Sequence, residues 1–310
     1  MKCPSVQLHP SPDASMPAFS RLVYGAWRIG DDADTSPAHV AAKIQACLDQ
    51  GISTFDHADI YGDYRCEALF GAALRARPDL RAQIQVITKC DILLLSGQFP
   101  ERRVKHYDTS PAHIRASVER SLERLGVERI DLLLLHRPDP FMDAGATGAC
   151  LDQLVAGGKV AAVGVSNFSP ADWQLLQSRM RTPLVTNQIE LGLLARSAFT
   201  DGQLAFLQQH RVRPMAWSPL GGGALMAQGD AASPAVQRLQ PALQRIAAEH
   251  GVMTDAVALA WLLAHPAGIL PVIGTNRIER IQRVNDAFKV RIDRQTWFEL
   301  WTLAEGHEVP

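Results

Sequence analysis

The stretch Phe55-Asp56-His57-Ala58-Asp59-Ile60-Tyr61-Gly62 decides how the rest of the chain is interpreted. It closes the apolar run 51–55 and leads into a helical segment at 66–76. An isolated Asp with a Tyr five positions later most often caps and packs against the next helix. Here, however, later apolar runs also end in polar residues, at Lys89, at His136 and at Ser166-Asn167. Because a Lys or His is costly to bury without a partner, several such ends indicate a shared polar site at the rim of a barrel.

The fold class follows from the apolar runs on either side of this stretch. Helical segments separate eight of them, near residues 22, 54, 86, 132, 162, 185, 215 and 271. Nearly continuous apolar runs are typical of parallel strands buried on both faces, and their alternation with helices indicates βαβ units. Eight units in 310 residues favour a (β/α)8 TIM barrel, with its active site at the C-terminal face, over an open doubly wound sheet. No composition shift marks a second domain, so 1–310 is predicted to form a single barrel domain.

Turn and capping residues place the helices and the long connections. Ser-Pro pairs at 36–37, 110–111, 169–170 and 233–234 predict helix starts, with Ser as the N-cap and Pro at the first helical position. Residues 1–21 hold two extended pieces separated by Pro10-Ser11-Pro12 and are predicted to be an N-terminal extension or hairpin. The long segments 90–109 and 220–232 follow strands, so we expect both βα loops to lie over the site.

The composition excludes several classes of function. A formal charge of −1 offers no electrostatic footprint for nucleic acid or an anionic membrane. The five cysteines have no metal-type spacing and are expected to be reduced thiols. The first 21 residues lack the apolar core of a signal peptide, and no run approaches the length of a membrane span. We expect a cytoplasmic protein, a monomer or weak homo-oligomer, that acts on a small molecule.

Four residues form a candidate acid–base site. A Tyr is a poor acid near neutral pH, because its ordinary pKa is about 10. An ammonium beside it lowers that pKa, and Lys89 on the neighbouring strand is expected to do this for Tyr61. Asp56 is the expected counter-charge of Lys89, and His136 on the next strand completes the set. Such a tuned Tyr is suited to protonating an oxygen, for example that of a carbonyl becoming an alcohol.

The electrons for such a reduction need a separate source, and the later strand ends are suited to a nicotinamide cofactor. Ser166, Asn167 and Gln188 offer amide and hydroxyl groups for a carboxamide, and Trp217 offers a face for ring stacking. The Gly-rich loop at 218–223 would allow backbone N–H groups to approach a pyrophosphate. Gly274-Thr275 is predicted to open a helix that carries three arginines, which would form an anion site for a 2′-phosphate; they are Arg277, Arg280 and Arg283.

Taken in order, these residues resemble the aldo-keto reductases over roughly 22–286. Three motifs further resemble the bacterial YdhF-like oxidoreductase branch, namely those at 57–62, 136–140 and 215–218. The resemblance implies a TIM barrel that binds NADPH without a Rossmann domain, with Tyr61 as proton donor and Asp56, Lys89 and His136 completing a tetrad. The expected cofactor-binding set is Gly25, Trp27, Ser166, Asn167, Gln188, Trp217, Ser218, Pro219, Leu220, Gly221, Gly274, Thr275 and Arg280.

The chain departs from the family pattern at three positions. His57 stands where many members have Thr, which alters the hydrogen bonding expected around Asp56. Gly274 replaces a Lys of many eukaryotic members, so a 2′-phosphate would depend more on Thr275 and Arg280. Val284 occupies a position where an Asn often contacts adenine, and Asn285 is one step away.

Two rival functions remain at this stage. A metal-dependent TIM-barrel hydrolase could use His57, Asp59 and His136, although it would leave Tyr61 and Lys89 without a role. A non-catalytic NADPH-binding sensor or regulatory subunit of the same fold would have no need of an intact tetrad. Aldehydes, ketones and quinones all suit a pocket formed by Trp27, 90–109 and the C-terminal tail. Cys90 is either activated by the adjacent Lys89 or buried and inert.

Overall fold

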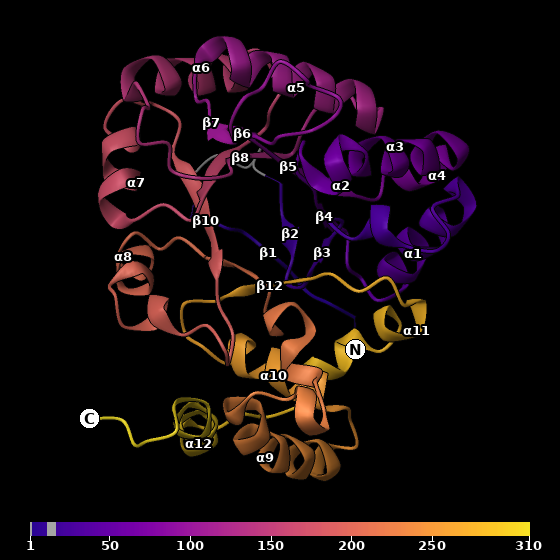
Figure 1. Cartoon of the computed structure of the whole chain (residues 1–310), viewed down its shortest axis with the longest axis vertical. Helices are drawn as coiled ribbons and strands as arrows, with labels where there is room; N and C mark the ends of the chain where they lie inside the picture. The colour runs from indigo at the N-terminus through magenta and orange to yellow at the C-terminus, as the bar shows by residue number, and fades with distance from the viewer. Residues whose placement is uncertain (1, 11–16) are drawn as a thin grey trace.

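The computed structural model describes residues 2–10 and 17–310 and contains a closed barrel of eight parallel strands. The helices surround these strands (Figure 1). In the order in which they pair around the barrel, the strands are β10 (Leu184–Glu190), β11 (Met215–Trp217), β12 (Leu270–Ile273), β3 (Val23–Gly25), β4 (Thr54–Asp56), β5 (Gln85–Cys90), β8 (Leu132–Leu135) and β9 (Val163–Ser166). Each predicted apolar run therefore contains one strand, and the TIM-barrel prediction is confirmed.

The helix starts follow the Ser-Pro signals. They open α1 (Pro37–Asp49), α5 (Pro111–Leu125), α7 (Pro170–Gln177) and α9 (Pro234–His250), and in each case the Ser side chain accepts a hydrogen bond from a backbone N–H of the first turn. The remaining helices are α2 (Tyr61–Tyr64), α3 (Cys66–Ala76), α4 (Pro78–Arg81), α6 (Ala144–Ala156), α8 (Gln203–Gln209), α10 (Thr254–Leu263), α11 (Ile278–Ile281) and α12 (Arg294–Glu305).

The N-terminal segment closes the bottom of the barrel. Strands β1 (Ser5–Val6) and β2 (Phe19–Ser20) pair antiparallel, as the hairpin prediction proposed, while Ser11 and Pro12 lie outside the described residues. Leu8 and Phe19 are fully buried in a cluster with barrel residues such as Val23 and Leu132. The polar site at the opposite, carboxyl ends of the strands therefore lies above a sealed apolar interior.

The two long βα loops differ in structure. Segment 90–109 contains its own antiparallel pair, β6 (Ile92–Leu93) and β7 (His106–Tyr107). Segment 220–232 contains two short 3-10 helices, η3 (Gly221–Met226) and η4 (Gly229–Ala231). No single helix in the described part of the chain is long and apolar enough to cross a membrane, although the bent pair α9 and α10 reaches that length and composition together.

Candidate functional site

A chain of three polar side chains, two buried and one half-buried, joins β4, β5 and the start of α2. The Lys89 ammonium is fully buried and lies 2.7 and 2.8 Å from the two Asp56 carboxylate oxygens. It also donates to the His57 carbonyl at 2.8 Å and to the Tyr61 hydroxyl at 3.1 Å. Asp56 ends β4, and parallel pairing of β4 with β5 brings Lys89 beside it. The predicted Asp–Lys–Tyr contact is thus present in the structure.

The electrostatics of this chain differ from the sequence-based expectation. Burial lowers the pKa of Lys89, whereas the Asp56 carboxylate and the Tyr61 hydroxyl raise it. Together these two partners outweigh burial, so the pKa of Lys89 lies above its ordinary value. Burial raises the pKa of Tyr61, the Lys89 charge lowers it and Asp56 raises it again. Lys89 therefore lowers the pKa of Tyr61 as predicted, but the net pKa of Tyr61 is raised, in contrast to the expectation of an acid tuned toward neutral pH. Desolvation of the phenolate outweighs one neighbouring ammonium that is already paired.

His136 follows β8 directly and faces the phenol ring. Its ring centroid lies 5.8 Å from that of Tyr61, with the planes at 79°. Burial, reinforced by the positive charges of Lys89, Arg137 and Lys105, holds the pKa of His136 well below its ordinary value. Its Nδ1 atom has no hydrogen-bond partner among the described residues. A neutral imidazole with unused capacity can donate or accept a hydrogen bond at the site without changing its charge.

The amide and hydroxyl groups on β9 and β10 are engaged with one another and with the acid–base chain. Gln188 donates from Nε2 to the Asp56 carboxylate at 3.0 Å, and the Gln188 backbone carbonyl accepts from the Ser166 hydroxyl at 2.8 Å. Asn167 donates to the Ser166 hydroxyl at 2.8 Å and accepts from the Trp217 indole N–H at 2.9 Å. Gln188 therefore supports Asp56 in addition to facing the cavity, a contact that the sequence did not reveal.

A cavity of about 810 Å³ opens above this network. Asp56, Tyr61 and His136 line it, whereas Lys89 lies beneath them. Of the expected cofactor residues only Gly221 is outside the lining, while the rest contribute; they are Gly25, Trp27, Ser166, Asn167, Gln188, Trp217, Ser218, Pro219, Leu220, Gly274, Thr275 and Arg280. Within the described chain no residue of 90–109 or of the C-terminal tail lines it, in contrast to expectation, because 90–109 folds into its own hairpin.

Arg277, Arg280 and Arg283 all line the cavity, but the helix that follows β12 begins later than predicted. Helix α11 begins at Ile278, with Arg277 as its N-cap and Arg280 within it, so the prediction that Gly274-Thr275 opens the helix is wrong. Arg277 and Arg280 are exposed, and Arg283 pairs with Asp255 at 3.6 Å. Gly274 is required for space, because a Cβ there would lie 2.8 Å from the Trp27 indole nitrogen.

These features can accommodate a nicotinamide dinucleotide and its phosphate groups. The part of the cavity lined by Arg277, Arg280 and Arg283, hereafter the arginine end, offers guanidinium groups to a phosphate. Gly222 and Gly223 bring left-handed backbone to the cavity wall, with φ of 65° and 106°. Val284 lines the cavity. Asn285 instead donates from Nδ2 to the Gln50 carbonyl at 2.6 Å, which directs that amide toward the end of α1.

The side chains of the hydrolase hypothesis are not assembled as ligands. His57 is fully buried with its ring edge-on to Phe70 at 4.4 Å, and burial together with Lys89 lowers its pKa to about 3. Asp59 accepts a 2.7 Å hydrogen bond from Ser117 on α5. Among the described residues no group of three or more His, Cys, Asp or Glu side chains is arranged to hold a metal ion.

Cys90 and several cavity residues complete the comparison with the sequence. Cys90 is buried, and burial raises its pKa well above the ordinary value, which favours the inert thiol. The sequence indicated no role for Arg28, Arg137 or Asn276, although all three line the cavity. Arg137 lies in the motif at 136–140, and its guanidinium is 5.8 Å from the Trp217 ring, so its position beside His136 was the available signal.

The chain is similar to several known proteins over most of its length. A 6-dehydroglucose reductase from Agrobacterium fabrum is 60% identical over 291 residues, which cover 94% of this chain and 96% of that protein. Oxidoreductase YdhF of Escherichia coli is 42% identical over 95% of this chain and 96% of its own. The solved structure of a glycerol dehydrogenase from Gluconobacter oxydans superimposes with a TM-score of 0.82 at 26% identity, over 95% of this chain and 97% of that one. Residues 21–304 match the model of the Aldo/keto reductase family, and the chain belongs to that family of oxidoreductases.

Proposed function

We propose that the protein reduces the carbonyl group of an aldehyde or ketone to an alcohol with NADPH. The observation that carries the proposal is the Asp56–Lys89–Tyr61 chain, which ends with its phenol at the wall of a cavity large enough for a dinucleotide and a small substrate. The bound nicotinamide would supply hydride to the carbonyl carbon. The chain's own residues would bind the carbonyl oxygen, deliver a proton to it and exclude water.

Each member of the tetrad has a separate role in this proposal. Tyr61 donates its hydroxyl proton to the carbonyl oxygen, and the Lys89 ammonium 3.1 Å away stabilises the phenolate that remains. Asp56 holds Lys89 in place and charged, because both carboxylate oxygens contact its Nζ atom. His136, held neutral by its low pKa, orients the carbonyl oxygen by a hydrogen bond.

The arginine end of the cavity would receive the adenosine 2′-phosphate. Arg280→Ala is expected to weaken NADPH binding at least tenfold, in line with the ~1.5–3 kcal/mol of a hydrogen bond to a charged group. The affinity for NADH, which lacks the 2′-phosphate, should fall less than about twofold. Arg291→Ala removes an exposed arginine outside the cavity lining and serves as the matched control. Equal weakening of both nucleotides by Arg280→Ala would reject the 2′-phosphate assignment.

The substrate that we propose is 6-dehydroglucose, the compound named for the relative from Agrobacterium fabrum. Reduction of its aldehyde would yield glucose, and a polyhydroxylated substrate suits a cavity whose reactive end includes Arg137, Asn167 and His136. NADPH consumption is therefore expected to be fastest with 6-dehydroglucose within a panel that includes apolar aldehydes and ketones. Consumption only with apolar carbonyls would reject this substrate and retain the reductase.

The same assay addresses the rival sensor function. Turnover of NADPH with any carbonyl identifies an enzyme, whereas binding without turnover across the panel would indicate a sensor. We propose a cytoplasmic protein, because all five cysteines are free thiols in a buried position. A single copy would suffice for activity, since one chain supplies both the tetrad and the arginine end.

A further inference from the structure

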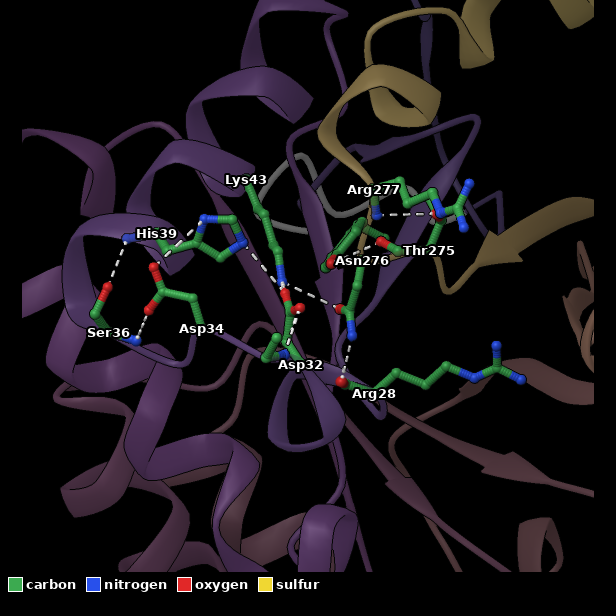
Figure 2. Close-up of polar contacts among 11 residues, drawn as sticks. Arg28, Asp32, Asp34, Ser36, His39, Lys43, Thr275, Asn276 and Arg277 are labelled. Atoms are coloured by element: carbon green, nitrogen blue, oxygen red, sulfur yellow. Dashed lines mark hydrogen bonds and ion pairs between the residues drawn. The ribbon is translucent and has the colours of Figure 1, made fainter.

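Lys43 is a buried cation that belongs to neither the tetrad nor the cavity wall. It lies on α1, its side chain is 1% exposed, and it is absent from the cavity lining. An ammonium is costly to remove from water unless its partners replace the lost hydrogen bonds. Its partners are the Asp32 carboxylate, and the Asn276 Oδ1 atom at 3.2 Å. Figure 2 shows Lys43 reaching from its helix toward both.

The Asn276 amide is held at both ends. Its oxygen accepts from Lys43, and its Nδ2 donates to the Arg28 carbonyl at 2.7 Å (Figure 2). A flipped amide would place its NH2 group against the ammonium and its oxygen against a carbonyl, and both contacts would be repulsive. The Lys43–Asn276 contact therefore fixes one orientation of a residue that lies 233 positions away in sequence.

Asp32 anchors the other side of Lys43. Its carboxylate also lies 3.2 Å from His39 Nε2, and His39 Nδ1 is 3.9 Å from Asp34. Burial raises the pKa of Asp32, but its contact with Lys43 lowers that pKa by more. The net pKa lies below its ordinary value, so the carboxylate is ionised at neutral pH. The pair is a charged link between the β3–α1 connection and α1.

The segment fixed by this link is 274–277, hereafter the phosphate-side segment. Helix α11 begins only at Ile278, so regular helical hydrogen bonds do not hold it. Instead, the Tyr24 hydroxyl donates to the Thr275 carbonyl at 3.1 Å, and the Arg277 N–H donates to the Thr275 hydroxyl at 3.2 Å. Asn276 lies between Thr275 and Arg277, which both line the cavity. Their position therefore depends on a side chain from α1.

We propose that Lys43, Asp32 and Asn276 form a cross-link that positions the phosphate-side segment and so sets the preference for a nucleotide bearing a 2′-phosphate. This inference rests on the proposed function, because it takes the arginine end of the cavity as the adenosine site. Lys43 is a positioning residue that acts through Asn276. Loss of either residue frees the segment that carries Thr275 and Arg277, and this affects only a nucleotide whose phosphate needs that segment.

Fluorescence titration with NADPH and with NADH tests the cross-link in wild type, Lys43→Met, Asn276→Ala and the double variant. Each single change is expected to raise the Kd for NADPH about tenfold, as for a lost hydrogen bond in a charged site. The Kd for NADH should change less than about twofold. The double variant should resemble either single variant, because residues that act through one contact are non-additive. Lys159→Met, at an exposed lysine paired with Glu119, is the control.

A second pair of variants separates positioning from stability. Lys43→Met leaves the Asp32 carboxylate without its cation, and adding Asp32→Asn should restore the melting temperature while the NADPH Kd stays raised. If Lys43→Met does not fold, Asn276→Ala carries the same binding test. Wild-type preference for NADPH that persists unchanged in these variants overturns the cross-link alone, as does an equal rise in both Kd values. Absence of any preference in the wild type overturns the proposed cofactor and this inference with it.

Discussion

Tyr61 is half-buried beside Lys89 and Asp56, and its pKa responds to desolvation and to both charges. The sequence correctly placed these residues together, because each lies at or near the end of a neighbouring parallel strand. It did not reveal that desolvation would outweigh the Lys89 charge, so the net pKa of Tyr61 was expected to fall, whereas it is raised. The result is a phenol that keeps its proton at neutral pH, which is the form needed to protonate a carbonyl oxygen.

The pH dependence of reduction should reflect this raised pKa. The Tyr61 hydroxyl stays protonated below its ordinary pKa of 10.0, and His136 stays neutral because its pKa lies well below 6.5. We expect kcat/KM for carbonyl reduction at saturating NADPH to be flat through neutral pH and to fall only in the alkaline range. A step near pH 7 that disappears in His136→Asn would show that the imidazole titrates and that its assigned neutral role is wrong.

Lys89 links catalysis to stability. Lys89→Met leaves the buried Asp56 carboxylate without its cation, so the free energy of unfolding should fall by about 3–5 kcal/mol. The kcat should fall about 10²-fold or more. Adding Asp56→Asn removes the unpaired charge and should recover much of the stability without recovering activity. Urea denaturation and turnover measured on the same samples separate the two effects. Recovery of activity together with stability would mean that Lys89 has only a structural role.

At the scale of elements, local signals predicted the helices that carry their own caps. Ser36, Ser110, Ser169 and Ser233 each accept a hydrogen bond from the first turn of the helix that follows. The prediction failed at 274–277, where Lys43 contacts Asn276 and Tyr24 contacts Thr275, both from far away in sequence. The sequence alone could not predict such long-range side-chain contacts.

The connection from β4 to α2 carries a second buried carboxyl with a testable pH effect. Burial raises the pKa of Asp59 from 3.8 to about 7, and Ser117 on α5 donates to it at 2.7 Å. Between these values the folded protein holds a proton that the unfolded chain has lost, so Asp59 reduces stability as pH rises from about 4 to about 7. Asp59→Asn should therefore stabilise the protein more at pH 8 than at pH 5 in urea denaturation. A gain that is equal at both pH values would show that Asp59 does not titrate in this range.

For the molecule as a whole, the eight predicted strands are confirmed, and the polar residues expected at their carboxyl ends lie around one cavity. Alternation of apolar runs with helices was sufficient for this, because a closed parallel barrel brings all strand ends to one rim. The sequence predicted the N-terminal hairpin but not its function. Leu8 and Phe19 seal the barrel floor, a contact between the hairpin and several distant strands at once.

Because Leu8 and Phe19 lie at the opposite end of the barrel from the candidate site, we expect them to affect stability and not turnover. Phe19→Ala should destabilise the protein by about 3–5 kcal/mol, as for other buried aromatic truncations. NADPH turnover below the melting temperature should be unchanged, since the floor lies at the opposite end of the barrel from Tyr61. The matched control is Phe141→Ala, at a side chain that is 97% exposed, which should alter stability by less than about 0.5 kcal/mol. A large loss of turnover in folded Phe19→Ala would show that the two ends of the barrel are coupled.

The most direct test of the proposed reaction is the single-turnover rate of NADPH oxidation by an aldehyde, measured for wild type and Tyr61→Phe. The substitution removes one hydroxyl and leaves the Lys89–Asp56 pair in place. With Tyr61 as the proton donor, the rate should fall about 10²–10⁴-fold, while the Kd for NADPH changes less than about twofold. An unchanged rate in Tyr61→Phe would contradict the assignment of Tyr61 as the acid.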